Sequence, residues 1–404
     1  MPDPVDPVAP APRASALAAV HKALGASFTD FGGWLMPVRY TSDLAEHHAV
    51  RRAAGLFDIS HMAEFVVTGP DAAPFLDHAL AGPLATLAVG RAKYTLLLNE
   101  GGGILDDLIV YRLAADRYLV IANAGNRTVV AEALEDRAQR WPIVATLAGG
   151  DRPAGGSFAL VRGSRPVRVD DVSDSYALLA LQGPRSSQIL SAVRGLEATG
   201  ADPAALSSYA WAEASFDGVP VLVLRTGYTG EDGYELLLPA DRAAGLWAAL
   251  QEAGEGLGLI PAGLAARDTL RLEAGMPLYG HELSADVRPD QVGLARVVGS
   301  GASGPPGFVG GDALARPRDA GAPVLVGLVS EGRRAARSGY PVRLGDSVVG
   351  NVTSGALSPT LGHPIAMAFV RPDLAAPGAA LDLDVRGTRI PATVTALPFY
   401  RRKK

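Results

Sequence analysis

The chain of 404 residues is longer than a single hydrophobic core usually supports, so its length predicts two or three domains. Its net charge of -5 argues against sequence-independent binding of nucleic acid, which requires a basic surface. The absence of cysteine excludes disulfides, thiolate catalysis and cysteine-ligated metals. No apolar run reaches the roughly 18 residues that cross a bilayer, so we expect a soluble protein without a membrane partner.

The first 14 residues contain five prolines, two aspartates and one arginine. A secretory signal needs a basic start and an apolar stretch, and a transit peptide is rich in arginine and poor in acidic residues. Neither description fits this segment. We therefore expect residues 1–14 to form a disordered tail on a cytoplasmic protein.

Hydrophobic periodicity predicts two amphipathic helices next, at residues 15–24 and 42–54, the first with Ser15 as its N-cap. The pattern then changes to a strand at 64–68, followed by a Gly-Pro turn and a helix that begins near Asp71. A β-meander follows, with strands at 93–98, 104–112 and 118–123.

The same order of elements recurs from about residue 176. A strand at 177–181, a Gly-Pro turn and a helix from Arg185 repeat the earlier strand, turn and helix, which indicates an internal duplication of an α+β unit. A hairpin is expected from strands at 219–225 and 234–238. From about residue 321, short strands and turns predict a small all-β barrel or sandwich, and residues 299–307 predict a linker before it.

Two adjacent aspartates, Asp106 and Asp107, lie inside an otherwise apolar strand directly after three glycines. An aspartate in such a strand is unfavourable unless it is hydrogen-bonded or functional. Because strand side chains alternate, the two carboxylates must point to opposite faces. One of them could face a site, but both could equally satisfy turn amides, and the spacing does not say which aspartate matters.

A second polar motif, residues 225–235, contains three glycines that let the backbone turn tightly or approach a ligand. It is neither a P-loop nor a dinucleotide fingerprint, and its plainer interpretation is a hairpin turn with Asp232 and Gly233 at the tip. Glu235 alternates away from Tyr234 and could face a pocket.

Two arginines, Arg267 and Arg271, lie four residues apart in a predicted helix at 264–274, so they share one face. With Asp268 and Glu273 nearby, this pattern favours a solvated, salt-bridged surface. The seven histidines show no metal-binding spacing, so no metal site is expected.

A series of motifs, in this order and over about residues 21–401, resembles the glycine cleavage T-protein family. Each motif is modest alone, and together they are specific. They are 30–37 (DFGGWLMP), 57–62 (FDISHM), 103–107 (GILDD), 181–184 (LQGP), 225–235 (RTGYTGEDGYE), 267–273 with 276–280 (RDTLRLE, MPLYG), 353–355 with 359–362 (TSG, PTLG) and 398–401 (PFYR).

The resemblance implies an α+β fold, a three-domain cloverleaf with duplicated α+β units around a central folate site and a C-terminal all-β barrel. Residues 15–298 would form the folate-binding region as two interleaved α+β domains, and 308–404 the barrel. The resemblance selects Asp107 as the catalytic carboxylate beside the pterin. The other residues that match the family's folate contacts are Met62, Tyr94, Asn123, Tyr209, Tyr228, Glu235 and Arg267, with Arg401 near the folate tail.

The activity implied by the resemblance transfers a methylene group from an S-aminomethyldihydrolipoyl carrier (H) protein to tetrahydrofolate and releases ammonia. The reactive sulfur belongs to the carrier, so an enzyme without cysteine can perform it. Two other functions remain open: folate-dependent demethylation of a methylated amine or sulfonium compound, and a non-catalytic folate-binding scaffold. The intact aspartate pair and 225–235 motif favour the aminomethyltransferase.

Overall fold

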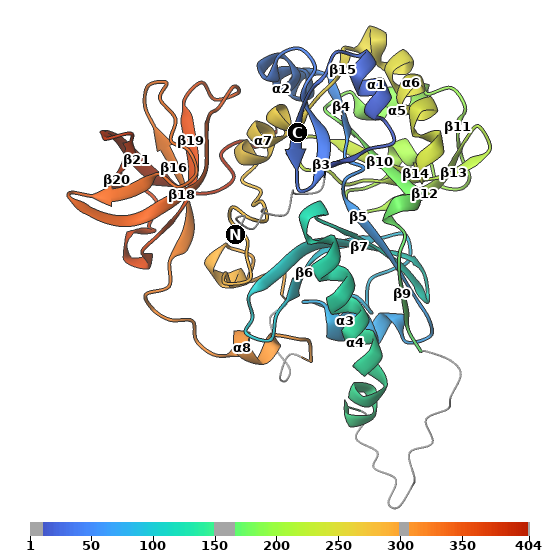
Figure 1. Ribbon diagram of the computed structural model, residues 1–404, viewed down its shortest axis with the longest axis horizontal. Helices are drawn as coiled ribbons and strands as arrows, with labels where there is room; N and C mark the ends of the chain where they lie inside the picture. The colour runs from blue at the N-terminus through green and yellow to red at the C-terminus, as the bar shows by residue number, and fades with distance from the viewer. Residues whose placement is uncertain (1–10, 149–165, 299–306, 403–404) are drawn as a thin grey trace, which may run out of the picture.

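The computed structural model describes residues 11–148, 166–298 and 307–402, which form two α+β lobes and a barrel (Figure 1). Residues 1–10 of the predicted tail and 299–306 of the predicted linker lie outside this part of the chain. The expectation of a disordered tail up to residue 14 is wrong for its last two residues. Arg13 and Ala14 form a short strand, because the Arg13 amide bonds to the Gly33 carbonyl and the Arg13 guanidinium stacks on Trp34.

The largest sheet has seven strands and makes the core of the first lobe. One face of it packs on two helices, where Leu246, Trp247 and Leu250 meet the apolar side chains of the central strands. In spatial order the strands are β11 (Leu196–Ala198), β12 (Trp211–Phe216), β13 (Val219–Leu224), β14 (Gly233–Pro239), β10 (Tyr176–Gln182), β4 (Ala54–Asp58) and β15 (Leu259–Pro261), and the helices are α5 (Ser186–Ala192) and α6 (Ala243–Gly254).

The second lobe is built the same way on a five-stranded sheet. Phe75 and Leu76 of one helix and Leu134 of the other cover one face of this sheet. The strands in spatial order are β6 (Ala92–Leu98), β7 (Ile104–Ala114), β8 (Arg117–Ala122), β5 (Ala63–Thr68) and β9 (Arg168–Asp171), and the helices are α3 (Ala72–Ala79) and α4 (Arg127–Ala148).

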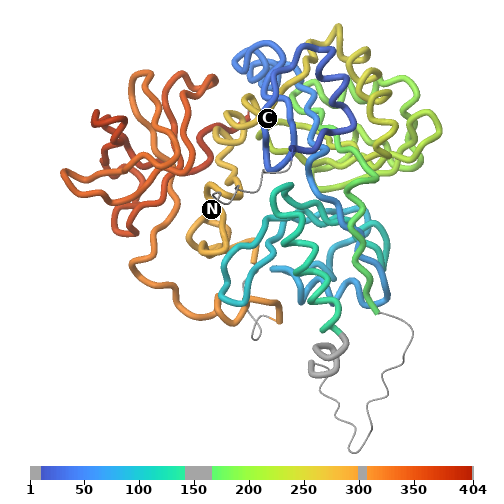
Figure 2. The backbone as a smooth tube through the Cα atoms, viewed as in Figure 1, coloured from blue at the N-terminus to red at the C-terminus, as the bar shows by residue number. Residues whose placement is uncertain are grey.

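The chain interleaves the two lobes. It leaves the first lobe after β4, builds the five-stranded lobe and returns at β10, so blue and green segments lie together in Figure 2. The two glycines that follow β5 and β10 occupy equivalent turns, with Gly69 at φ 127° and Gly183 at φ 136°. A Cβ atom at either position would come within 2.5 Å of a backbone carbonyl oxygen, so both turns require glycine.

The first lobe is completed by a short three-stranded sheet, β1 (Arg13–Ala14), β3 (Trp34–Arg39) and β2 (Ser27–Phe31), and by helices α1 (Ala18–Ala23) and α2 (Asp43–Arg52). Helix α1 begins at Ala18, so the prediction that Ser15 caps it is wrong. The Ser15 hydroxyl donates instead to the buried Asp58 carboxylate at 2.6 Å. Ser42 does cap α2, and it accepts from the Ala45 amide.

The C-terminal lobe is a closed barrel of six strands: β16 (Val324–Ser330), β19 (Pro364–Val370), β18 (Ser347–Leu357), β17 (Pro341–Leu344), β20 (Ala380–Val385) and β21 (Thr388–Thr395). The barrel strands begin at Val324, close to residue 321 where the strand pattern was expected to start, whereas residues 308–323 of the expected barrel domain lie outside the barrel. The preceding segment, with α8 (Gly311–Ala315), packs Phe308 and Leu314 against the ends of β6 and β7, because both side chains are apolar.

Helix α7 (Leu264–Glu273) lies between the barrel and the first lobe (Figure 1). Leu272 on this helix packs on Ile365 and Met367 of the barrel. No helix in the described part of the chain is both long and apolar enough to cross a membrane.

Candidate active site

A cavity of about 280 Å³ lies where the uncovered faces of the two large sheets meet. Ile109 and Ile121 line it from the five-stranded sheet, and Leu178 lines it from the seven-stranded sheet. Met276 and Pro277, in the segment after α7, form another part of its wall. The walls are mainly apolar, which favours a flat organic ligand whose orientation is set by a few polar groups.

The structure brings eight of the nine predicted site residues to this cavity: Met62, Tyr94, Asp107, Asn123, Tyr209, Tyr228, Glu235 and Arg267. The ninth, Arg401, is exposed and is not part of the cavity wall. These residues come from segments that are far apart in the sequence, and the packing of the two sheets unites them.

The two adjacent aspartates have different surroundings, as strand alternation requires. Asp107 lines the cavity, where it accepts hydrogen bonds from the Tyr94 hydroxyl at 3.1 Å and the Asn123 side-chain amide at 2.7 Å. Asp106 is fully buried and accepts from the backbone and side-chain amides of Asn123 and from the Asn126 amide. Asp106 thus holds Asn123 in place, and Asn123 in turn fixes the Asp107 carboxylate.

Burial and the neighbouring negative charge of Asp107 raise the pKa of Asp106 to about 7. Burial also raises the pKa of Asp107 above its ordinary value, although hydrogen bonds from Asn123 and Tyr94 oppose the shift. Burial and the charge of Asp107 raise the pKa of Tyr94, so the phenol remains a neutral hydrogen-bond donor. A carboxylate with a raised pKa at a cavity wall is suited to accept or relay a proton.

The Arg267 side chain contacts an aromatic ring but forms no ion pair within the described residues. Its guanidinium group lies 4.5 Å from the centre of the Tyr228 ring, and none of the hydrogen bonds or ion pairs found there involves its side-chain nitrogens. Burial lowers the pKa of Arg267 because few acceptors replace the lost water. Its free N–H groups can therefore donate to an acceptor on a ligand.

The prediction that Arg267 and Arg271 face solvent is wrong. Arg271 is 1% exposed and forms an ion pair of 3.0 Å with Glu282, which is also buried. It also donates to Ser354 of the barrel. Helical spacing correctly placed the arginines on one face, but the barrel and the segment after α7 cover that face.

Glu235 lines the cavity from β14 of the seven-stranded sheet and takes part in a short series of hydrogen bonds. It accepts from the Thr226 hydroxyl at 2.6 Å, and Thr226 also contacts the Tyr111 hydroxyl at 2.7 Å. Burial raises the pKa of Glu235, while the charge of Arg267 opposes that shift. Glu235 and Arg267 thus offer an acceptor and a set of donors to the same ligand.

Gln182 also lines the cavity and was not among the predicted site residues. A Cβ atom at Gly227 or Gly233 would come within 2.2 Å of its side-chain amide, so these glycines make room for Gln182. The Gln182 amide accepts from Thr229, another lining residue, at 3.0 Å. The sequence signal for Gln182 was a polar residue at the end of a buried apolar strand, directly before a Gly-Pro turn.

Tyr209 lies at the mouth of the cavity with 41% of its surface exposed. Its φ of 57° is unusual for a residue with a side chain. The backbone around it is held by the Arg225 carbonyl, which accepts from Tyr209, and by the Ala92 amide, which donates to Tyr209. This aromatic side chain is therefore held at the entrance by its backbone.

No group of three or more His, Asp or Glu side chains suited to a metal ion occurs in the described ranges.

Comparisons with known proteins match both halves of this architecture. The family model described as GCVT N-terminal domain matches residues 17–301, and the glycine cleavage T-protein C-terminal barrel domain matches residues 324–401. The chain belongs to the glycine cleavage T-protein family. This confirms the family expected from the motifs and, with the closed barrel, the expected α+β fold.

Members of the T-protein family are similar to this chain over nearly its whole length. A protein of Streptomyces avermitilis named aminomethyltransferase is 53% identical over 404 residues, covering 98% of this chain and 99% of the relative. A Cutibacterium acnes protein of the same name is 51% identical, covering 96% and 99%. The crystal structure of glycine cleavage system aminomethyltransferase T from Bartonella henselae is 34% identical, with a TM-score of 0.81, covering 97% of this chain and 99% of that chain.

Proposed function

We propose that this chain is the aminomethyltransferase of a glycine cleavage system. It transfers the methylene group of an S-aminomethyldihydrolipoyl carrier protein to tetrahydrofolate, giving 5,10-methylenetetrahydrofolate, ammonia and the dihydrolipoyl carrier. The observation that carries this proposal is the cavity of the T-protein family fold, in which the hydrogen-bonded Asp107 carboxylate and the unpaired Arg267 guanidinium line one apolar pocket. A cytoplasmic location suits this reaction, because the cytoplasm keeps the dithiol product reduced.

Tetrahydrofolate is the proposed ligand of the cavity because its pterin is flat and has polar edges. The apolar walls would cover the ring faces, while Arg267 donates to pterin acceptors and Glu235 accepts from pterin N–H groups. Met62 and Tyr209 would contact the ligand near the entrance. We assign Arg401, outside the cavity wall, to the negatively charged tail of the folate.

In this reaction the carrier loses both bonds to the methylene carbon, the C–N bond to the amine and the C–S bond. Two new bonds form to N5 and N10 of tetrahydrofolate, and the two protons lost from these nitrogens go to the amine and the thiolate. Asp107 would stabilise the positive charge that develops as N5 is alkylated and would relay one of the protons. Such contributions are typically worth about 10² to 10⁴ in rate.

The direct test is ammonia release from the aminomethylated carrier protein, with and without tetrahydrofolate. We expect fast release and formation of 5,10-methylenetetrahydrofolate only when both substrates are present, and no effect of a chelator. Turnover of a methylated amine or sulfonium compound, or folate binding without turnover, would overturn the proposal. Loss of activity on metal removal, restored by added metal, would also contradict it.

The pH dependence of the chemical step should follow the raised pKa of Asp107. A protonated carboxyl cannot accept a proton, so we expect the single-turnover rate to fall about tenfold per pH unit below the apparent pKa of the Asp106–Asp107 pair. Because burial raises that pKa, the loss should begin at a higher pH than for an exposed carboxyl. The single-turnover rate of Asp107→Asn should not show this fall at low pH. If the fall is unchanged in the variant, Asp107 is not the group whose protonation causes it.

Replacement of Arg401 tests the assignment of the folate tail. Arg401 is exposed in the segment after Tyr400, whose amide bonds to the Glu273 carbonyl at the end of α7. We expect Arg401→Ala to weaken tetrahydrofolate binding by about 1 to 3 kcal/mol, the range for a lost charge-assisted hydrogen bond. Calorimetry should detect this change, with Arg402→Ala as the control, because Arg402 pairs with Asp232. Equal affinities for wild type and Arg401→Ala would reject the assignment.

A further inference from the structure

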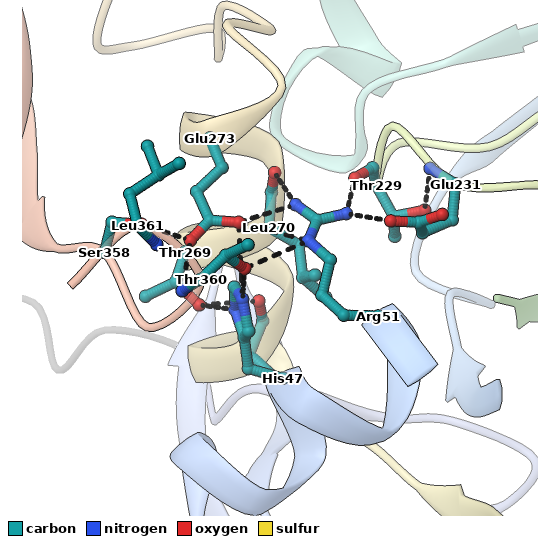
Figure 3. A network of polar contacts seen from close by, with 11 residues as sticks. His47, Arg51, Thr229, Glu231, Thr269, Leu270, Glu273, Ser358, Thr360 and Leu361 are labelled. Atoms are coloured by element: carbon teal, nitrogen blue, oxygen red, sulfur yellow. Dashed lines mark hydrogen bonds and ion pairs between the residues drawn. The ribbon is translucent and has the colours of Figure 1, made fainter. Parts of the chain in front are cut away.

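A buried polar cluster outside the cavity joins four segments of the chain (Figure 3). It combines side chains of α2 and α7 with a barrel loop at residues 358–361 and with the loop at 227–231 between β13 and β14. Its central ions are Arg51 of α2 and Glu273 of α7, whose side chains are 4% and 0% exposed. The guanidinium and carboxylate groups lie 2.8 Å apart.

The Glu273 carboxylate holds the barrel loop. It accepts from the Ser358 hydroxyl and from the Thr360 amide, the latter at 3.0 Å. His47 of α2 contacts the Thr360 hydroxyl at 2.8 Å on the same side of the cluster. Burial by itself raises the pKa of Glu273. Three neighbours outweigh this effect and lower the pKa to about 2: His47, through its hydrogen bond and its charge, the Ser358 hydroxyl, and the charge of Arg51.

The Arg51 guanidinium holds the cavity wall. It donates to the Thr229 carbonyl at 2.7 Å and to the Glu231 carboxylate at 2.9 Å, while Tyr400 stacks against it at 4.1 Å. The Thr229 side chain lines the cavity and donates to Gln182, which lines it as well. Arg51 itself does not reach the cavity wall.

The cluster is one connection through which the barrel can act on the cavity. No described barrel residue lines the cavity, yet Thr360 of the barrel accepts from Arg51 at 3.3 Å. One guanidinium group therefore contacts the barrel loop, α7 and the cavity loop at the same time. Its planar, branched donors suit this task, and the single ammonium of a lysine could not reproduce all of these bonds.

We propose that Arg51 is a positioning residue that sets the affinity for tetrahydrofolate, by fixing the 227–231 loop of the cavity wall against the barrel loop at 358–361. This inference rests on the proposed function. Arg51 bonds to the backbone carbonyl of Thr229, the residue after Tyr228, so loss of its contacts changes the position of the cavity wall and leaves Asp107 untouched. The barrel thereby contributes to folate binding without contacting the folate pterin.

The test measures kcat, the KM for tetrahydrofolate and thermal unfolding for Arg51→Met, Arg51→Lys and Thr360→Val. Thr360→Val removes only the barrel-side hydroxyl and is close to isosteric, so it remains informative if Arg51→Met fails to fold. The control is Asp384→Asn, which breaks the barrel ion pair of 2.9 Å with Arg343. That pair takes no part in the cluster, so its loss should lower stability alone.

We expect Arg51→Met to raise the KM for tetrahydrofolate about tenfold while kcat changes by less than about twofold. Arg51→Lys should recover part of the affinity, and Thr360→Val should raise KM in the same direction. A lower unfolding temperature with an unchanged KM in all three variants would show a purely structural role and overturn the inference. Wild-type enzyme that does not respond to tetrahydrofolate would instead overturn the proposed function.

Discussion

The chemical step is expected to slow by about 10² or more when Asp107 is replaced by asparagine, while tetrahydrofolate still binds. Asparagine keeps the shape of the side chain but removes its negative charge and its ability to accept a proton. The apolar walls and Arg267 remain in place, so the ligand keeps most of its contacts. Single-turnover ammonia release, measured beside folate affinity, separates the loss of chemistry from a loss of binding.

Asp106→Asn is the matched control for this substitution. Three N–H groups, from Asn123 and Asn126, donate to the Asp106 carboxylate, and an amide in its place would oppose one of them with a donor of its own. We expect a stability loss of about 1 to 3 kcal/mol and a loss of rate much smaller than that of Asp107→Asn, because the Asp107 carboxylate itself is kept. A folded but inactive Asp106→Asn, or near-normal turnover of Asp107→Asn, would show that the catalytic carboxylate has been assigned to the wrong residue.

The second large effect is expected at Arg271, where Arg271→Met should destabilise the protein by about 3 to 5 kcal/mol. The substitution leaves the Glu282 carboxylate buried without its cation. Arg271 also connects α7 to Ser354 of the barrel, so the contact between these two parts loses a hydrogen bond. Urea unfolding followed by circular dichroism would measure the change in the free energy of unfolding.

The double variant Arg271→Met with Glu282→Leu tests the origin of that loss. Because the second substitution removes the unpaired carboxylate, the double variant should be more stable than Arg271→Met alone. It should not regain full stability, because the Leu278 amide loses Glu282 as its acceptor. If Arg271→Met alone lowers the free energy of unfolding by less than about 1 kcal/mol, the proposed cost of an unpaired buried charge is wrong.

Local sequence signals determined part of the secondary structure of the two α+β lobes, while helices α4 and α6 and strands β2 and β3 were not among the predicted elements. The repeated strand, Gly-Pro turn and helix found around Gly69 and Gly183 is present in both sheets, because a turn of this kind depends on the few residues within it. The barrel strands were expected from short apolar runs between turns, and the closed barrel confirms them. Alternation also placed Asp106 and Asp107 on opposite faces.

The candidate site required more than these local signals. Alternation could not say which aspartate faces a cavity, since that depends on where the second sheet packs. The family motifs selected Asp107, and the structure places it at the cavity wall. Gln182 was missed because nothing in its own segment shows that Gly233, its partner on the neighbouring strand β14, and Gly227, in the loop before β14, leave space for its side chain.

Tertiary structure alone decided the surroundings of the charged helix residues. Spacing along α7 puts Arg267 and Arg271 on one face, but only the barrel and the segment after α7 bury that face. The Arg51–Glu273 pair likewise joins residues 222 positions apart. A sequence determines periodicity and local chemistry directly, whereas burial, and with it the strength of a charge, depends on segments that meet only after folding.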